Sequence, residues 1–236
     1  MGTEAAVQTR GRLTAAAKEE IASFKAGVAE VERLLNAHDA GSELSRLAAC
    51  SDEEILARCD ASVRPCYEMA FDLMKKSGRA FNPRWRGPKT MDLGAIAKGY
   101  AIDLARVGSF RAGGPDCLVD VGGNLWAERG SWTTGIAGTS ETFVLGEGVA
   151  VATSAEYYRG KHIRDGRTGL PVSNEVASVT VCVPGSAMEA DGLSTTLFVL
   201  GPDEGRRFLT EEWKTSGVRA VWFMKDETKV ECHVGF

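Results

Sequence analysis

Residues 92–103 read Asp-Leu-Gly-Ala-Ile-Ala-Lys-Gly-Tyr-Ala-Ile-Asp, a stretch that combines an apolar helix pattern with two glycines and a lysine. The pattern predicts a helix over 96–107. Gly94 and Gly99 have no side chain, so the backbone at the start of this helix can approach a ligand closely. The free N–H groups of a helix start and the charge of Lys98 together favour binding of an anion. The alternative is a tightly packed helix whose lysine is only solvated.

Helical patterns dominate the chain before this stretch. Apolar residues at three- and four-residue intervals predict one helix over 13–37 and another over 51–76. Ser51 followed by Glu54 predicts a capping box at the start of the second helix.

Strand patterns dominate the chain after the opening stretch. Short runs separated by turn residues predict strands over 117–121, 132–136, 142–145, 149–152 and 177–183. Further elements are predicted as a helix over 188–200 that ends at Gly201-Pro202, a short helix over 203–209, and a hairpin of 218–224 with 229–234. Because helices precede strands, we predict an α+β fold with helices packed on a mainly antiparallel sheet, rather than a doubly wound parallel sheet. We expect one domain over 1–236, built as one compact unit or as two lobes.

The composition excludes several classes of protein. Of 236 residues, 44% are hydrophobic and 25% are charged, which is average for a soluble globular chain. The 28 Lys and Arg against 32 Asp and Glu give a formal net charge of −4, so we expect no nucleic-acid partner. No apolar run approaches the roughly 20 residues of a membrane span, so we expect no transmembrane segment. The first residues lack a signal-peptide pattern, which leaves the compartment open between the cytoplasm and, if an export segment was removed, the periplasm.

The cysteines do not form a metal or redox motif. All six occur without a C-x-x-C pair and without a cluster with the three histidines. Most have apolar neighbours, as Cys182 does between two valines, and this predicts small buried side chains. A single disulfide bridge is the alternative.

A second polar segment lies inside the C-terminal helix pattern. Asp191 and Thr195 are four residues apart, so on a helix both oxygen-bearing side chains point from one face. A carboxylate and a hydroxyl at this spacing can hold a hard cation such as Mg²⁺, whose coordination shell substrate phosphates complete. The alternative is a capping role, in which Asp191 caps a helix that starts at Gly192.

A third segment joins Thr153-Ser154, at the end of a predicted strand, to the polar residues 161–171. His162 stands there beside Asp165 and two arginines, and an imidazole is the commonest general base in enzymes. The alternative is a plain turn with exposed arginines.

A fourth segment places Gly122-Gly123 directly after a predicted strand, between Asp120 and Asn124. Two glycines there allow a flat ligand to approach the backbone closely, or form a β-bulge. No G-x-G-x-x-G, G-x-x-x-x-G-K-[ST] or G-x-S-x-G motif occurs, so the sequence supports neither a dinucleotide-binding fold, nor a P-loop, nor a serine hydrolase.

Taken together and in this order, the segments resemble the FAD:protein FMN transferases, the ApbE-type flavin transferases. The resemblance covers almost the whole chain. The matching segments are 1–3 with M-G-T, 41–47 with D-S-E-[IL]-S-R-[LF], 78–83 with G-G-A-F-D-[PI], 92–103 with D-L-G-[AG]-I-A-K-G-Y-A-[VI]-D, 120–124 with N-x-G-G-D, 152–154 and 162–169 with A-[TV]-S and H-I-[IL]-D-P-[RK]-T-G, and 188–201 with A-D-A-L-[SA]-T-A-L-F-[VA]-L-G.

The resemblance implies a reaction and the residues that perform it. In this family Mg²⁺ sits on the FAD pyrophosphate, and the FMN phosphoryl group passes to a Thr or Ser hydroxyl of a target flavoprotein with release of AMP. The acceptor segment reads D-x-x-[ST]-G-A-[ST]. By this resemblance Asp191, Thr195 and the carbonyl of Ala95 bind the metal, and His162, assisted by Asp165, takes the proton of the acceptor hydroxyl. The residues implied around FAD are Met1, His38, Ala80, Phe81, Asn82, Asp92, Lys98, Gly122, Gly123, Thr153, Ser154 and Ile163.

The chain departs from the family pattern at single positions and in one loop. Single-residue departures are His38 for a ring-stacking Tyr, Asn82 and Asn124 for Asp, Gly166 for Pro, and Gly192 for Ala. Only residues 84–90 remain between Pro83 and Met91, where the family usually has a loop and strands tens of residues long that help to cover FAD. We therefore expect a more open site.

The sequence is compatible with two other functions. An open site favours an FAD pyrophosphatase that releases FMN and AMP. The departures at His38 and Asn82 favour a flavin-binding or flavin-delivery protein without turnover.

Overall fold

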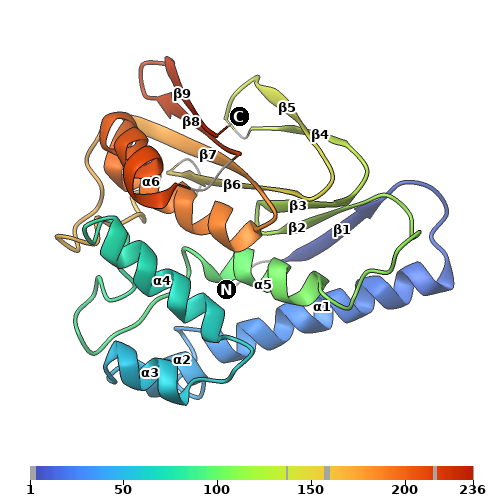
Figure 1. The fold of residues 1–236 in the computed structure, drawn as a ribbon, viewed down its shortest axis with the longest axis horizontal. Coiled ribbons are helices and arrows are strands. Elements are labelled where there is room, and N and C mark those ends of the chain that lie inside the picture. The colour runs from blue at the N-terminus through green and yellow to red at the C-terminus, as the bar shows by residue number, and fades with distance from the viewer. Residues whose placement is uncertain (1–3, 137, 157–159, 215–216, 236) are drawn as a thin grey trace.

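The structure, a computed structural model, describes residues 4–136, 138–156, 160–214 and 217–235. Its centre is a seven-stranded sheet in the order β1-β2-β3-β6-β7-β8-β9, in which every neighbouring pair is antiparallel (Figure 1). A separate antiparallel pair joins β4 and β5. The strands are β1 (Ala5–Thr9), β2 (Cys117–Val121), β3 (Asn124–Arg129), β4 (Trp132–Gly135), β5 (Thr142–Leu145), β6 (Val149–Ala155), β7 (Val176–Pro184), β8 (Val218–Met224) and β9 (Lys229–Val234).

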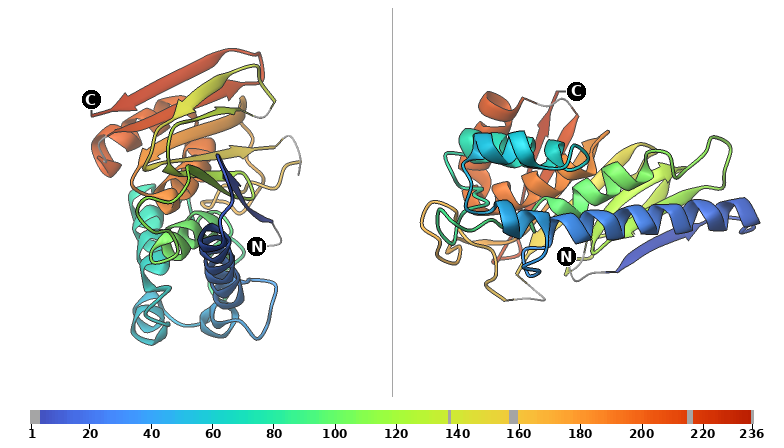
Figure 2. Two further views of the ribbon diagram at one scale, coloured as in Figure 1. Left: turned by 90° about the vertical axis from the view of Figure 1, so that its right-hand side faces the viewer. Right: turned by 90° about the horizontal axis from the view of Figure 1, so that it is seen from below.

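The helices gather on one side of this sheet (Figure 1). They are α1 (Ala15–Leu35), α2 (Glu43–Leu47), α3 (Asp52–Arg58), α4 (Arg64–Lys76), α5 (Ala97–Arg106), α6 (Ala187–Arg207) and the π-helical turn η1 (Phe208–Trp213). Helix α6 packs on β6 and β7, α5 packs between α6 and α1, and α1 runs beside the edge strand β1 (Figure 2). The predicted α+β fold, with helices on a mainly antiparallel sheet, is confirmed.

Alternating side chains bury both faces of the sheet near β2. Val119 points into the large core between sheet and helices. Its neighbour Leu118 joins a smaller cluster with Trp132 and Leu145, which the β4–β5 pair contributes on the opposite face. Burial on both faces explains why the first three residues of β2, Cys117-Leu118-Val119, are all apolar and do not alternate with polar residues.

The helix predicted over 51–76 is wrong in one respect, because the chain breaks into α3 and α4. Ser51 and Glu54 form the predicted capping box, with each side chain accepting from the backbone N–H of the other. Helix α3 ends at Arg58, and the N–H of Asp60 donates to the Glu43 carboxylate of α2 instead of continuing the helix. Pro65 stands in the first turn of α4, where its missing N–H costs nothing.

Three elements were not predicted: β1, α2 and β3. Strand β1 is an edge strand of five residues with two alanines, and α2 is also only five residues long. Strand β3 begins directly after the Gly122-Gly123 turn. Strand β1 and helix α2 carry too few large apolar residues to show a hydrophobic period, and β3 reads Asn-Leu-Trp-Ala-Glu-Arg, without strict apolar–polar alternation.

The helix predicted over 188–200 ends at Gly201, as predicted, because the φ of 72° at this glycine interrupts the helical geometry of α6. A second helical segment follows the kink at Gly201, as predicted, and passes into η1, so the helix predicted over 203–209 exists but ends later than predicted. The closing hairpin of β8 and β9 is confirmed.

All six cysteines are free, so the disulfide alternative is wrong. Three of them are buried, as predicted, and three are half-buried. Burial raises the pKa of Cys182 to about 11. Among the described helices, none is long and apolar enough to cross a membrane.

One carboxylate fixes the start of α6. Asp103 of α5 accepts hydrogen bonds from the backbone N–H groups of Ala187 and Met188, at 3.0 and 2.9 Å, and from the Ser186 hydroxyl at 2.9 Å. A carboxylate at a helix start satisfies otherwise unpaired donors and interacts favourably with the helix dipole. Asp103 therefore sets where α6 begins relative to α5.

We expect Asp103→Ala to lower the free energy of unfolding by about 1–2 kcal/mol, the upper range for loss of a helix cap. Urea unfolding followed by far-UV circular dichroism measures this change. A loss below about 0.5 kcal/mol, the size of an ordinary surface substitution, would show that Asp103 does not fix α6.

Candidate active site

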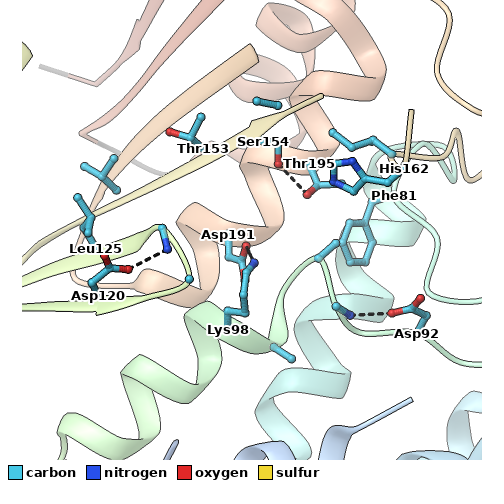
Figure 3. Close-up of a pocket in the computed structure, with 18 of the residues that line it drawn as sticks. Phe81, Asp92, Lys98, Asp120, Leu125, Thr153, Ser154, His162, Asp191 and Thr195 are labelled. Atoms are coloured by element: carbon cyan, nitrogen blue, oxygen red, sulfur yellow. Dashed lines mark hydrogen bonds and ion pairs between the residues drawn. The ribbon is translucent and has the colours of Figure 1, made fainter. Parts of the chain in front are cut away.

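A cavity of about 1040 Å³ lies where the start of α5, the middle of α6 and the end of β6 meet (Figure 3). The β2–β3 turn, the β4–β5 pair and the loops around residues 80–86 and 162–164 complete its wall. The predicted site residues that line it are His38, Ala80, Phe81, Asn82, Asp92, Ala95, Lys98, Gly122, Gly123, Thr153, Ser154, His162, Ile163, Asp191 and Thr195. Met1 lies outside the described residues, and Asp165 is not part of the wall.

Asp191 occupies the point where α5 and α6 cross. Its side chain is only 4% exposed. One carboxylate oxygen accepts from the Gly99 N–H at 2.9 Å. The other lies 3.0 Å from the Lys98 Nζ (Figure 3). The sequence predicted an anion at the start of α5, and the Asp191 carboxylate of the protein itself takes part of that place.

The capping alternative for Asp191 is wrong. Helix α6 begins at Ala187 with Ser186 as its cap, so Asp191 lies inside the helix. Asp191 and Thr195 both reach the cavity, as their spacing predicted.

The crossing of α5 and α6 depends on Gly99. A Cβ at this position would overlap the Ala187 carbonyl oxygen and would lie 2.8 Å from the Cβ of Asp191. No side chain fits there, so glycine permits the close approach that brings the Gly99 N–H to the Asp191 carboxylate.

Hydroxyl groups extend the oxygen-rich surface next to Asp191. The Ser154 Oγ at the end of β6 lies 3.0 Å from the Thr195 Oγ1 and 2.9 Å from the Ser194 Oγ of α6. Thr153 bonds in the same way to Thr180 on β7, at 2.9 Å. The strand thus presents its two predicted hydroxyls in fixed positions along the cavity wall.

The donor set next to the cavity fits Mg²⁺ better than a transition metal. Within the described residues no three His, Cys, Asp or Glu side chains cluster as a metal site. Asp191 and Thr195 offer hard oxygen atoms, and the backbone of Ala95 lines the same cavity. A site with so few protein oxygens suits Mg²⁺, which keeps several waters and takes phosphate oxygens of a substrate as ligands.

Two other carboxylates of the cavity are engaged in local contacts. Asp92 accepts from the Gly94 N–H at 2.9 Å and lies 3.5 Å from a guanidinium nitrogen of Arg86. Asp120 accepts from the Gly123 N–H at 2.8 Å. These bonds shape the loops at the rim of the cavity.

Gly122 and Gly123 form the two-residue turn between β2 and β3. Their φ values of 59° and 88° lie in the left-handed region that favours glycine. The register pairs Val121 with Asn124, so the segment is a hairpin turn and the bulge alternative is wrong at this position. The turn lines the cavity, where its backbone is open to a ligand.

His162 is exposed in the cavity wall, and one ring nitrogen is engaged. Its Nδ1 lies 2.9 Å from the Gly160 carbonyl oxygen. Since a carbonyl can only accept, the neutral ring donates from Nδ1 and leaves Nε2 to accept a proton. This tautomer suits a general base.

Asp165 does not assist His162 in this arrangement. It accepts several hydrogen bonds from Arg167, the shortest side-chain contact being 2.8 Å. Partial burial raises the pKa of Asp165, but the hydrogen bonds and charge of Arg167 outweigh it and hold this pKa below the usual range. Asp165 therefore remains ionised and fixes the turn.

Two departures from the family pattern contact each other. The Asn82 side-chain amide donates to the Gly166 carbonyl at 2.8 Å, and the Gly166 N–H donates to the Ala80 carbonyl at 3.1 Å. A Cβ at Gly166 would lie 2.8 Å from the backbone nitrogen of Asn82, so a larger residue does not fit. The pair joins the loop that carries Phe81 to the segment that carries His162.

The short loop 84–90 contributes residues that were not predicted. Arg84 anchors it with hydrogen bonds to the Ala48 and Cys50 carbonyls and to Asp52. Trp85 then lines the cavity, with the guanidinium carbons of Arg86 and Arg164 at 4.5 and 5.5 Å from its ring. The sequence feature that could have indicated a binding role is a tryptophan between two arginines, Arg84-Trp85-Arg86, in a loop.

Apolar side chains line both ends of the cavity, where Asp120 and Asp92 also lie, and Lys98 and Asp191 stand between the two ends. Figure 3 shows Lys98 and Asp191 between Leu125 at one end and Phe81 at the other. Leu125 belongs to one apolar cluster with Leu118, Trp132, Phe143 and Val151. Ala80 is the chain neighbour of Phe81, and Trp85 and Ile163 are further apolar residues of the wall. The cavity therefore suits an elongated ligand with flat apolar ends and a charged centre.

Comparisons with known proteins show the family of the chain. The model of the ApbE family matches residues 85–222. A Klebsiella pneumoniae protein named FAD:protein FMN transferase is 31% identical over 160 residues, which are 59% of this chain and 45% of that protein. A Salmonella typhimurium protein of the same name is 28% identical over 191 residues, covering 72% and 53%. The chain thus spans about half the length of these relatives.

Solved structures share the fold. The apo form of the Pseudomonas stutzeri flavinyl transferase ApbE has a TM-score of 0.75 at 22% identity, covering 98% of this chain and 94% of that one. The flavin transferase ApbE from Vibrio cholerae has a TM-score of 0.76 at 22% identity, covering 99% and 94%. With more than half of its residues matched by the family model and the same fold, the chain belongs to the ApbE family.

Proposed function

We propose that the chain is a Mg²⁺-dependent FAD:protein FMN transferase. The hydroxyl oxygen of an acceptor Thr or Ser forms a bond to the FMN phosphorus, the bond from this phosphorus to the bridging oxygen of the diphosphate breaks, and AMP leaves with that oxygen. The observation that carries the proposal is the buried Asp191 carboxylate beside the hydroxyls of Thr195 and Ser154, in the charged centre of the cavity. The names of the relatives support the same reaction.

The shape of the cavity supports FAD as the substrate. FAD carries a flat ring system at each end and a diphosphate between them. The apolar groups around Leu125 and around Phe81 suit the two rings, and Lys98 suits the diphosphate. Trp85 supplies an aromatic face in the same cavity wall as His38, which replaces the family's tyrosine.

Asp191, Thr195 and the Ala95 carbonyl are the groups that would hold Mg²⁺. When bound, the metal supplies charge stabilisation at the phosphate oxygens, which is the main requirement of phosphoryl transfer. The chain itself orients the diphosphate through Lys98 and the helix start. His162 Nε2 accepts the proton of the acceptor hydroxyl.

We expect His162→Gln to reduce the rate of flavin transfer by about 10²–10⁴-fold, the usual contribution of a general base. The affinity for FAD, measured from flavin fluorescence, should change little because the imidazole ring of His162 is exposed at the cavity wall. Asp165→Asn serves as the matched control and should retain most of the rate, since Asp165 pairs with Arg167 outside the cavity. An equal loss of transfer rate in both variants would contradict a base role for His162 that is independent of Asp165.

The experiment that tests the function is incubation of the purified chain with FAD, Mg²⁺ and a peptide containing a D-x-x-[ST]-G-A-[ST] segment. A mass increase of the peptide by FMN less one water is the expected result. AMP and free FMN without an adduct would replace the proposal with FAD hydrolysis. FAD binding without AMP would indicate a flavin-binding or flavin-delivery protein.

A further inference from the structure

Lys98 already neutralises the carboxylate that would hold the metal. Its Nζ lies 3.0 Å from one oxygen of Asp191, while the Gly99 N–H occupies the other at 2.9 Å. The Asp191 side chain is 4% exposed and that of Lys98 is 21% exposed. In the described part of the chain, Asp191 is the only carboxylate within ion-pair distance of Lys98.

This arrangement opposes binding of a divalent cation by itself. A cation at Asp191 would lie close to the Lys98 ammonium, and like charges a few ångströms apart repel strongly where water is partly excluded. Moving Lys98 away would break a mostly buried ion pair and leave its charge without a partner. Either route weakens metal binding to the protein alone.

A diphosphate removes the obstacle. It offers Lys98 a new anionic partner in the same cavity and supplies oxygen ligands that complete the Mg²⁺ shell. We propose that Lys98 is a counter-ion which neutralises Asp191 until a diphosphate ligand draws it away, so that the metal and the diphosphate bind cooperatively and each binds weakly alone. This inference rests on the proposed function, because it concerns the same metal and substrate groups.

Cooperativity of this kind is reciprocal. The factor by which a diphosphate raises metal affinity must equal the factor by which the metal raises diphosphate affinity. We expect a factor within the range of about 5- to 150-fold that couples typical pairs of sites. Removing the charge of Lys98 should raise metal affinity in the absence of diphosphate by about tenfold. It should also lower the coupling factor by about the same amount, to the part that direct contact between diphosphate and metal supplies.

The experiment is a titration of the protein with Mn²⁺, with and without ADP, in which electron paramagnetic resonance measures the free Mn²⁺. ADP carries the diphosphate and adenosine of FAD but no flavin, and titrations without protein correct for the complex of Mn²⁺ with ADP. The proteins are the wild type, Lys98→Gln, Lys98→Arg and Asp191→Asn. Lys98→Arg keeps the charge and should keep the coupling, which separates a charge effect from a structural one.

Each outcome decides the matter. Strong coupling in the wild type and in Lys98→Arg, with tighter Mn²⁺ binding and about tenfold weaker coupling in Lys98→Gln, supports the inference. If Lys98→Gln binds Mn²⁺ no more tightly than the wild type and keeps the coupling, the inference is wrong while the metal site stands. If wild type and Asp191→Asn bind Mn²⁺ equally, with or without ADP, the metal assignment in the proposed function fails as well. Should Lys98→Gln be unstable, a wild type without coupling overturns the inference by itself.

Discussion

Asp191→Asn is expected to reduce flavin transfer by about 10²–10³-fold while the chain still folds. A bound metal contributes several kcal/mol of charge stabilisation in the transition state, and each 1.36 kcal/mol corresponds to about tenfold in rate. Asparagine keeps the size of the side chain and an oxygen that can accept from the Gly99 N–H. It removes the charge that attracts both Lys98 and a divalent cation.

The measurement is the initial rate of FMN attachment to the acceptor peptide, determined by mass spectrometry at saturating FAD and Mg²⁺. Asp72→Asn is the matched control, since the ion pair of this α4 residue with Lys76 is exposed and its loss should leave the rate unchanged. A rate for Asp191→Asn within threefold of the wild type would contradict its role as a metal ligand.

Gly99→Ala is expected to damage both stability and activity. The added Cβ would overlap the Ala187 carbonyl oxygen, and both atoms belong to packed helices. Overpacking in a core costs typically about 1–3 kcal/mol, and a clash with backbone favours a loss of about 3 kcal/mol or more. Separation of α5 from α6 would also withdraw the Gly99 N–H from Asp191.

Urea unfolding of Gly99→Ala beside Gly146→Ala measures this effect. A Cβ at Gly146 would meet no atom within 4 Å, so this substitution should change the free energy of unfolding by less than about 0.5 kcal/mol. Equal stability of the two variants would show that the helices can separate without cost, and that Gly99 does not define the site.

Much of the candidate site could be predicted because its residues lie at the ends of strong local patterns. Asp191 and Thr195 share a helix face that the sequence spacing determines. The Gly122-Gly123 turn follows an apolar strand, and such turns are visible in a sequence. These inferences need only neighbouring residues.

The remaining features depend on contacts between distant residues. The Lys98–Asp191 pair joins residues 93 positions apart, and neither motif alone indicates that one neutralises the other. The partner of Asp165 is a local one, because Arg167 two residues further on pairs with its carboxylate in place of His162. Trp85 was missed because its place in the cavity depends on the anchoring of its loop by Arg84.

The most direct test of the central claim is the stoichiometry of products in one reaction. With FAD, Mg²⁺ and acceptor peptide, we expect the wild type to release one AMP for each FMN attached to the peptide. Asp191→Asn should yield neither product at a comparable rate. AMP released without attached FMN, or FMN attached at equal rates by both proteins, would contradict a flavin transferase whose metal is held by Asp191.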